Sequence, residues 1–216
     1  MIVLDKRLKE IAFATGKGSV MADIGSDHGF LSLFLLQNKQ AEKIYVCDIS
    51  EKSLEKAQKL FSSCNEQAIF VISDGFKQLS CKKIDVAIIA GMGGIEIGKI
   101  VTNIPKEMHV EKIVCQPMRN VLELKHRMIE LGYKICEDTY AQDKQRFYEI
   151  ITFKKGANCL SELEIEFGKE NIEILPQSFV EFLKKEEKRF KKVASGSEFA
   201  RIKIEKIREI LRRKNE

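Results

Sequence analysis

The stretch VMADIGSDHGF, residues 20–30, joins a short apolar run to a loop that holds three polar residues between two glycines. The apolar run is typical of a buried strand, and the segment LSLFLLQNK after the loop has the composition of a helix. Gly25 permits a tight turn, and Gly29 lets the helix begin close to the sheet. Backbone N–H groups at such a turn suit a polar or anionic ligand group. The rest of the chain decides whether this loop is a binding site.

Short β-branched runs alternate with helix-like segments on both sides of this loop. The strand-like runs are VMADIG (20–25), KIYVCD (43–48), AIFVIS (68–73), IDVAIIAG (84–91) and EKIVCQ (111–116). This alternation predicts an α/β fold with a parallel sheet covered by helices on both faces. Two further runs, YKICEDTYA and QRFYEIITFKK, predict an antiparallel hairpin that completes the sheet.

The composition changes after Gly156. Two long segments with helical periodicity, FVEFLKKEEKRFKKV (179–193) and EFARIKIEKIREILRRK (198–214), predict a helical hairpin or short coiled coil. We therefore expect an α/β domain over residues 1–156 and a helical domain over residues 157–216.

The charge is concentrated in the second of these regions. Residues 182–216 contain 13 lysines and arginines against 6 acidic residues, a net charge of +7, whereas the whole chain carries +5. The remainder is therefore slightly acidic, and the helical tail is the expected anion-binding face, which favours a nucleic-acid partner. The alternative is a solvated helix face with no ligand.

The overall composition excludes several classes of protein. Hydrophobic residues make up 44% and charged residues 32%, which indicates a globular chain. No apolar run is long enough to cross a bilayer, and the pattern of the first residues leads us to expect no secretory signal. Six scattered cysteines, at 47, 64, 81, 115, 136 and 159, form no C-x-x-C pair, so we expect no metal site and free thiols in a reducing cytoplasm. We favour a monomer.

Acidic residues stand at the ends of the second and third predicted strands. Asp48 comes 25 residues after Asp23, and a carboxylate there can accept hydrogen bonds from both hydroxyls of a ribose. Asp74, in the triplet SDG, can accept from an adenine amino group. With the glycine loop, these acids predict a site for S-adenosylmethionine, in which Asp27 pairs with the ammonium group of the methionine part. The alternative is that Asp48 and Asp74 only cap the following helices.

Three glycines follow the fourth predicted strand in IIAGMGGIE, residues 88–96. Backbone without side chains lets a flat ring approach the methyl donor, and the next helix offers N–H donors at its N-terminus. A tight strand-to-helix turn needs only one glycine, so three of them favour a ligand site over a turn alone.

These features together resemble the bacterial tRNA (adenine-N1)-methyltransferases that modify adenine 22 in the D-loop region. The resemblance rests on DIGSDHG, Asp48, AGMGG, the pair Gln116-Pro117 and the closing RFYEI, and it covers roughly the whole chain. It implies a Rossmann-like class I methyltransferase domain with a C-terminal coiled coil, and methyl transfer to N1 of a tRNA adenine. One position departs from the family, because Met118 stands where the family has Asn; Asn120 is the candidate substitute.

The patterns assign candidate residues to three roles. The catalytic candidates are Asp27 and Gln116. The cofactor-binding candidates are Asp23, Gly25, Ser26, Asp27, His28, Gly29, Asp48, Ile49, Asp74, Gly75, Gly91 and Met92. The substrate-binding candidates are Arg7, Gly93, Gly94, Pro117, Arg119, Lys184, Lys188, Lys191 and Arg201.

The expected chemistry needs orientation more than proton transfer. Adenine N1 has a free lone pair at neutral pH, so the site should orient the base, accept a hydrogen bond from N6–H and offer negative potential. We expect Asp27 to orient the donor or the base, or else only to hold the loop through backbone bonds. Gln116 can read an adenine edge or cap the next helix, and His28 fits a structural residue better than an acid or base. The adenine must leave its stack in the folded tRNA.

Three rival functions use parts of the same pattern. A nicotinamide oxidoreductase shares the strand, loop and acid, but Asp27 would repel a pyrophosphate. A non-catalytic RNA-binding module could keep a vestigial cofactor pocket, and a methyltransferase could act on a protein or a small molecule. The basic tail makes the last of these less favourable than tRNA.

Overall fold

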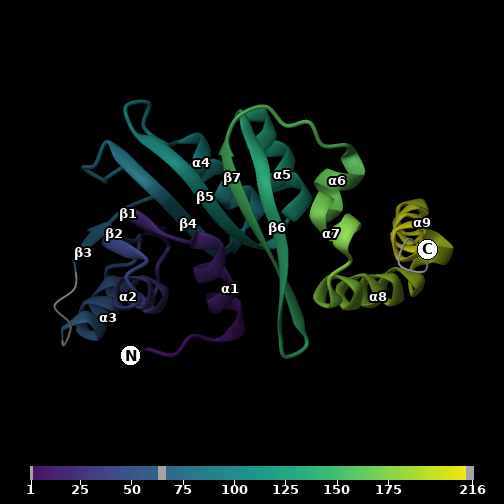
Figure 1. Cartoon of the computed structure of the whole chain (residues 1–216), viewed down its shortest axis with the longest axis horizontal. Helices are drawn as coiled ribbons and strands as arrows, with labels where there is room; N and C mark the ends of the chain where they lie inside the picture. Colours follow the sequence, from purple (N-terminus) through teal and green to yellow (C-terminus); the bar gives the residue numbers. More distant parts are fainter. Residues whose placement is uncertain (1, 63–66, 213–216) are drawn as a thin grey trace.

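The computed structural model describes residues 2–62 and 67–212. Its centre is a seven-stranded sheet in the order β3-β2-β1-β4-β5-β7-β6 (Figure 1). Strands β1 to β5 are parallel, β7 is antiparallel to β5, and β6 is antiparallel to β7. The strands are β1 (Gly18–Ile24), β2 (Ala41–Asp48), β3 (Ala68–Ile72), β4 (Lys83–Gly93), β5 (His109–Arg119), β6 (Tyr133–Asp143) and β7 (Arg146–Lys155). This confirms the predicted Rossmann-like sheet with its antiparallel hairpin.

Helices cover both faces of the sheet, as predicted. The helices are α1 (Lys6–Thr15), α2 (Phe30–Gln37), α3 (Glu51–Phe61), α4 (Gly94–Thr102), α5 (Val121–Glu130), α6 (Glu162–Phe167), α7 (Lys169–Ile174), α8 (Gln177–Lys191) and α9 (Glu198–Arg212), with a 3₁₀ turn at Ala194–Gly196.

Successive strand residues feed two separate cores, because side chains alternate across a sheet. In β1, Met21 packs in the core under α1, α2 and α3, whereas Ala22 and Ile24 pack in the core under α4 and α5. Burial on both faces explains why the inner strands read as continuous apolar runs. Because helices cover both faces of the sheet, the loops meet at the carboxyl ends of the strands.

The C-terminal helices lie beyond the β6 edge of the sheet (Figure 1). A third apolar core joins them to the sheet through Tyr140 of β6, which packs with Phe179 and Leu183 of α8 and with Ile207 of α9. The predicted helices α8 and α9 are confirmed. A coiled coil between them, and the division at residues 156 and 157, stay predictions; Arg213 and Lys214, counted in the basic tail, lie outside the described residues.

Helix α1 was not predicted from the sequence. Asp5 caps it, since its carboxylate accepts a hydrogen bond from the Leu8 N–H at 2.7 Å. At the other end, Lys112 donates from Nζ to the carbonyl of Thr15 at 2.5 Å and so ties α1 to β5. This helix matters because it brings Arg7 and Leu8 to the site described next. In the described part of the chain, no helix has the length and apolar character needed to cross a membrane.

Candidate active site

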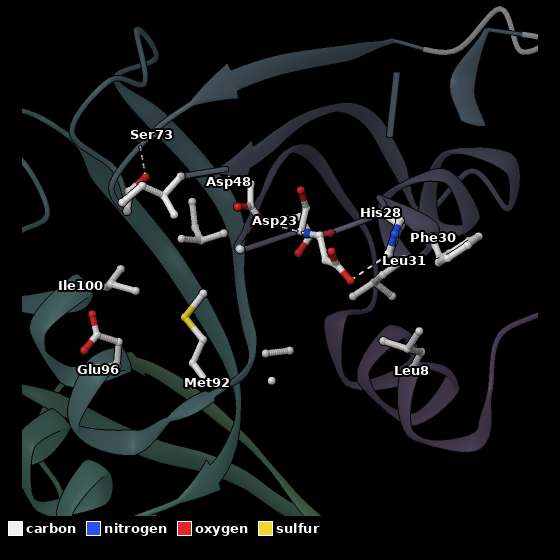
Figure 2. A pocket seen from close by; sticks show the side chains of 18 of the residues that line it. Leu8, Asp23, His28, Phe30, Leu31, Asp48, Ser73, Met92, Glu96 and Ile100 are labelled. Atoms are coloured by element: carbon white, nitrogen blue, oxygen red, sulfur yellow. Dashed lines mark hydrogen bonds and ion pairs between the residues drawn. The ribbon is translucent and has the colours of Figure 1, made fainter. Parts of the chain in front are cut away.

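A cavity of about 760 Å³ opens at the carboxyl ends of β1, β2, β3 and β4. This is the point at which the strand order reverses, between β1 and β4, where ligands of open α/β sheets bind. Figure 2 shows Asp23, Asp48 and His28 on one side of the cavity and Met92 and Glu96 on the other. Six carboxylates line it against one guanidinium, that of Arg7; the acids are Asp5, Asp23, Asp27, Asp48, Asp74 and Glu96. The lining therefore suits a cationic ligand.

The glycine loop forms one wall of the cavity. Gly25 has φ +74° and Gly29 has φ +72°, left-handed values that favour glycine at both positions. The N–H groups of Gly25 and Ser26 donate to the carbonyl of Cys47 at 2.8 and 2.9 Å, which anchors the loop on β2. The side chain of Met92 lies so close to Gly25 that any Cβ added there would overlap it.

Asp48 links the loop to α3. One carboxylate oxygen accepts from the Asp27 N–H at 3.0 Å and the other from the Ser50 N–H at 2.8 Å. Ser50, not Asp48, caps α3, because its hydroxyl accepts from the Ser53 N–H at 3.3 Å. Asp48 still lines the cavity and keeps lone pairs for a ligand.

Asp74 and its neighbour Gly75 line the cavity at the end of β3. The chain makes turns rather than a helix directly after Asp74, so helix capping does not explain its presence. Its exposed carboxylate pairs with Lys77 at 2.5 Å. An adenine amino group there would therefore share this carboxylate with a lysine. Ile49, 73% exposed, also lines this part of the cavity.

Asp23 is the most perturbed acid of the cavity. Burial raises its pKa to about 6, although a hydrogen bond from the Ser32 hydroxyl at 2.6 Å opposes the shift. The charge of Asp48 raises the pKa further. A cationic group bound nearby would favour the ionised form.

The hydroxyl group of Ser26 is a candidate contact for a ligand. Its Oγ is buried, yet within the described residues it has no hydrogen-bond partner. Buried polar groups are normally paired. Ser26 also lines the cavity, so a polar group of a ligand would satisfy it.

Asp27 has a left-handed backbone with φ +50° and a carboxylate that faces the start of α3. One oxygen pairs with His28 Nδ1 at 2.9 Å, and the other accepts from the Ser53 hydroxyl at 3.5 Å. His28 therefore has the structural partner expected of it. Asp27 lines the cavity beside Asp48, and its hydrogen bonds within the described residues join it to Asp48, His28 and Ser53.

The three glycines of AGMGG have different environments. Gly91, at φ +79°, lines the cavity, and only Arg7 Nη1 lies within 4 Å of a Cβ added to it. Gly93 packs against Arg119, and Gly94 is buried against the carbonyl of Asn120. Both therefore pack against the end of β5 and the start of α5, and substrate contact by Gly93 and Gly94 stays a prediction.

Gly94→Ala should lower the free energy of unfolding by about 1–3 kcal/mol, the usual cost of overpacking. The added methyl group would overlap the backbone oxygen of Asn120, which cannot rotate away as a side chain would. Urea unfolding of both proteins measures the difference. Gly196→Ala is the matched control, since nothing lies within 4 Å of its added Cβ; an equal midpoint for the two variants would contradict the prediction.

Gln116 is buried and its amide is fully engaged. Its Oε1 accepts from Arg7 Nη1 at 2.8 Å, and its Nε2 donates to the carbonyl of Pro117 at 2.9 Å. That Gln116 reads an adenine edge stays a prediction; in this structure both ends of its amide have protein partners. The Arg7 guanidinium lies 5.8 Å from the ring centre of Tyr148, so Gln116 and Tyr148 together hold Arg7 beside Gly91.

The remaining substrate candidates lie away from this cavity. Pro117 and Arg119 line a second cleft, as do Met118 and Asn120, so the replacement of the family Asn by Asn120 stays a prediction. Lys184, Lys188 and Arg201 are exposed and make no ion pair within the described ranges, whereas Lys191 pairs with Glu187 at 2.9 Å.

Sequence reasoning missed several cavity residues. These are Asp5, Leu8, Ile24, Phe30, Leu31, Ser73, Ala90, Glu96 and Ile100. The cap residue Asp5 ahead of KRLKEIAFAT was the available signal for α1, and thus for Leu8. Nothing local marked Ile100, which reaches the cavity because α4 packs beside β4. Among the described residues, no cluster of three or more His, Cys, Asp or Glu side chains could hold a metal ion.

Comparisons with known proteins agree with this geometry. Residues 4–151 match the family model of a methyltransferase domain. The chain is 31% identical over 156 residues to a Mycoplasma genitalium protein named "Putative tRNA methyltransferase MG248", covering 70% of each chain. It is 26% identical to the tRNA (adenine(22)-N(1))-methyltransferase of Bacillus subtilis, covering 71% of this chain and 66% of that protein. M. capricolum TrmK in complex with S-adenosyl-homocysteine superposes with a TM-score of 0.82 at 26% identity, covering 95% and 96% of the two chains.

Proposed function

Because the chain belongs to the methyltransferase-domain family, and within it to the tRNA (adenine-N1)-methyltransferases, we propose that it methylates N1 of adenine 22 in tRNA with S-adenosylmethionine. The observation that carries this proposal is the acidic cavity at the switch point of the sheet. A sulfonium and an ammonium group fit such a lining, whereas the pyrophosphate of a nicotinamide cofactor does not.

Different residues of the cavity fit different parts of S-adenosylmethionine. Asp48 would hold the ribose, with Ile49 against the adenine and Asp74 near its amino group. The glycine loop, with the unpaired Ser26 hydroxyl and the buried Asp23, would hold the methionine part. When bound, the donor supplies an electrophilic methyl group.

The protein's contribution to transfer is orientation and electrostatics. The carboxylates give the cavity a negative potential, which favours the positive charge that passes to the adenine. Asp27 adds to that potential from beside Asp48, and its bonds to His28 and Ser53 orient it. Gly91 leaves room for a flat ring, and Arg7, which lies beside Gly91, would contact the target nucleotide. Gln116 is a positioning residue that acts through Arg7.

The tail would bind the tRNA backbone. Lys184, Lys188 and Arg201 are exposed cations, and neutralising phosphates with such residues is the main source of nonspecific affinity. We place the protein in the cytoplasm as a monomer. The described cysteines, Cys47, Cys81, Cys115, Cys136 and Cys159, are free thiols, which fits a reducing compartment; Cys64 lies outside the described residues.

Incubation with unmodified tRNA and labelled donor tests the function. We expect label in 1-methyladenosine at position 22, and its loss when that adenine is replaced by guanine. Label on another nucleoside, or none on any tRNA, rejects the proposal. Label on protein or on small molecules alone would support the rival methyltransferases.

The affinity for S-adenosylmethionine should fall as the pH drops below about 6. Asp23 is protonated in the free protein below that pH, and a cationic ligand binds the ionised form better. With a folded pKa of about 6, the dissociation constant should rise roughly four-fold at pH 5.5 and roughly ten-fold at pH 5, relative to pH 7.5. Calorimetric titration across this range measures it. Asp23→Asn should bind more weakly but with a flatter profile; an unchanged profile would assign the titration to another group.

A further inference from the structure

A second cleft, of about 770 Å³, opens between the sheet and the C-terminal helices. Its walls come from the end of β5, the start of α5, the β6–β7 hairpin, α6, α8 and α9. We call it the aromatic cleft, after Tyr140, Phe147, Phe182, Phe190 and Phe199, which line it. It is about as large as the cofactor cavity and shares no lining residue with it.

We propose that the aromatic cleft holds an unpaired base of the tRNA, a nucleotide flanking the adenine that is methylated. This inference rests on the proposed function, because it needs a tRNA whose target base enters the cofactor cavity.

The first support is the position of the cleft. Pro117 and Arg119 line it, and in the sheet they pair with Met92 and Gly93 of β4. Met92 lines the cofactor cavity, so residues paired on two neighbouring strands, which lie about 4.8 Å apart in a sheet, line the two depressions. An RNA strand that leaves the cavity across β5 therefore meets the aromatic cleft next.

The second support is the exposure of its rings. Phe199 is 62% exposed at the margin of the cleft, and Phe147 and Phe182, 6.0 Å apart, are only partly buried. Proteins bind single-stranded nucleic acid by stacking bases on such rings.

The third support is the arrangement of charge. Four carboxylates line the cleft, and three of them are in ion pairs: Glu149 with Lys125 at 2.5 Å, Glu166 with Lys203, and Glu186 with Arg189 at 2.7 Å. The fourth, Glu123, accepts a hydrogen bond from the Asn120 amide at 3.3 Å. Arg119 makes no ion pair among the described residues and is free for a phosphate at the β5 side. Because the interior of the cleft is nearly neutral and aromatic, it suits a nucleic-acid base better than a charged phosphate backbone.

A double-mutant cycle between protein and RNA tests the proposal. The variant Phe147→Ala/Phe199→Ala is paired with tRNAs made abasic at the nucleotide on either side of the target. For the wild type, one of the two abasic tRNAs should bind about ten-fold more weakly. The variant should bind intact tRNA about ten-fold more weakly than the wild type does. It should bind that abasic tRNA no more weakly than it binds intact tRNA. Phe147→Tyr/Phe199→Tyr should restore binding, and Phe13→Ala, an exposed phenylalanine on α1, is the matched control.

The outcomes separate the two proposals. Wild-type methylation of intact tRNA is measured first, and its absence rejects the function itself. If the wild type methylates tRNA, two results overturn the proposal for the aromatic cleft alone. One is that the losses of affinity from the protein variant and from the abasic tRNA add; the other is that the double variant binds tRNA as tightly as the wild type. Thermal unfolding checks the fold of the double variant; if it fails to fold, Phe199→Leu, which keeps apolar volume without a ring, is put through the same cycle and read in the same way.

Discussion

Asp48→Asn should weaken the binding of S-adenosylmethionine by about 100-fold. Hydrogen bonds to a charged group contribute roughly 1.5–3 kcal/mol each, so the loss of two to a ribose costs about 3 kcal/mol. A difference of about 1.4 kcal/mol corresponds to a factor of ten in the dissociation constant. Asn also keeps only one acceptor oxygen, so one of the two N–H groups, that of Asp27 or that of Ser50, loses its hydrogen bond, which loosens the loop. Calorimetric titration measures the affinity.

Asp74→Asn is the matched control for this prediction. Its carboxylate is exposed and already shared with Lys77, so we expect a loss of less than about ten-fold, because a single weakened contact is at stake. The KM for the methyl donor should rise with the dissociation constant in Asp48→Asn. If the two variants weaken binding equally, Asp48 does not hold the ribose.

The sequence was most informative where local pattern dictates structure. Continuous β-branched runs such as KIYVCD are buried on both faces in a parallel sheet, and all five parallel strands lie where those runs predicted them. The acids at strand ends were equally readable, because every parallel strand ends at the same edge. Asp23, Asp48 and Asp74 accordingly converge on one cavity.

The parts that could not be predicted depend on contacts between distant segments. Gln116 looked like a residue aimed at substrate, but its orientation is set by Arg7, 109 positions earlier, on a helix that the hydrophobic pattern did not indicate. Gly91 and Gly94 are alike in sequence, yet one faces the cavity and the other the Asn120 carbonyl. Spacing predicts which residues share a strand end; it does not predict which neighbour fills the space beside each one.

Spacing in the sequence also does not predict the junction between the sheet and the C-terminal helices, where Lys125 is fully buried. Its Nζ lies 2.6 Å from Asp138 of β6 and 2.5 Å from Glu149 of β7, and it donates to the carbonyl of Glu166 in α6 at 3.2 Å. Burial, with the charge of Glu149 adding to it, holds the pKa of Asp138 well above its usual range, while the two carboxylates raise the pKa of Lys125. This cluster fixes α5, the hairpin and α6 together, and thereby one wall of the aromatic cleft.

Lys125→Met should therefore lower the free energy of unfolding by about 3–5 kcal/mol at pH 8, the usual cost of breaking a buried ion pair. The reason is that both carboxylates would stay buried without a cation. Carboxyl groups whose folded pKa is raised favour the folded state at low pH and disfavour it at high pH, so the deficit should shrink as the pH falls toward 5. Urea unfolding at both pH values, with the m-value checked, measures it.

Two further variants show whether the loss comes from unpaired charge. Lys125→Met/Asp138→Asn/Glu149→Gln should recover most of the stability, because it leaves no buried carboxylate uncompensated. Arg127→Met, on the same helix but with a 44% exposed side chain paired to Glu130, should cost less than about 1 kcal/mol. A deficit for Lys125→Met no larger than that of Arg127→Met, or one that does not shrink at lower pH, would mean that the helices are held to the sheet by their apolar core around Tyr140 and not by this charge cluster.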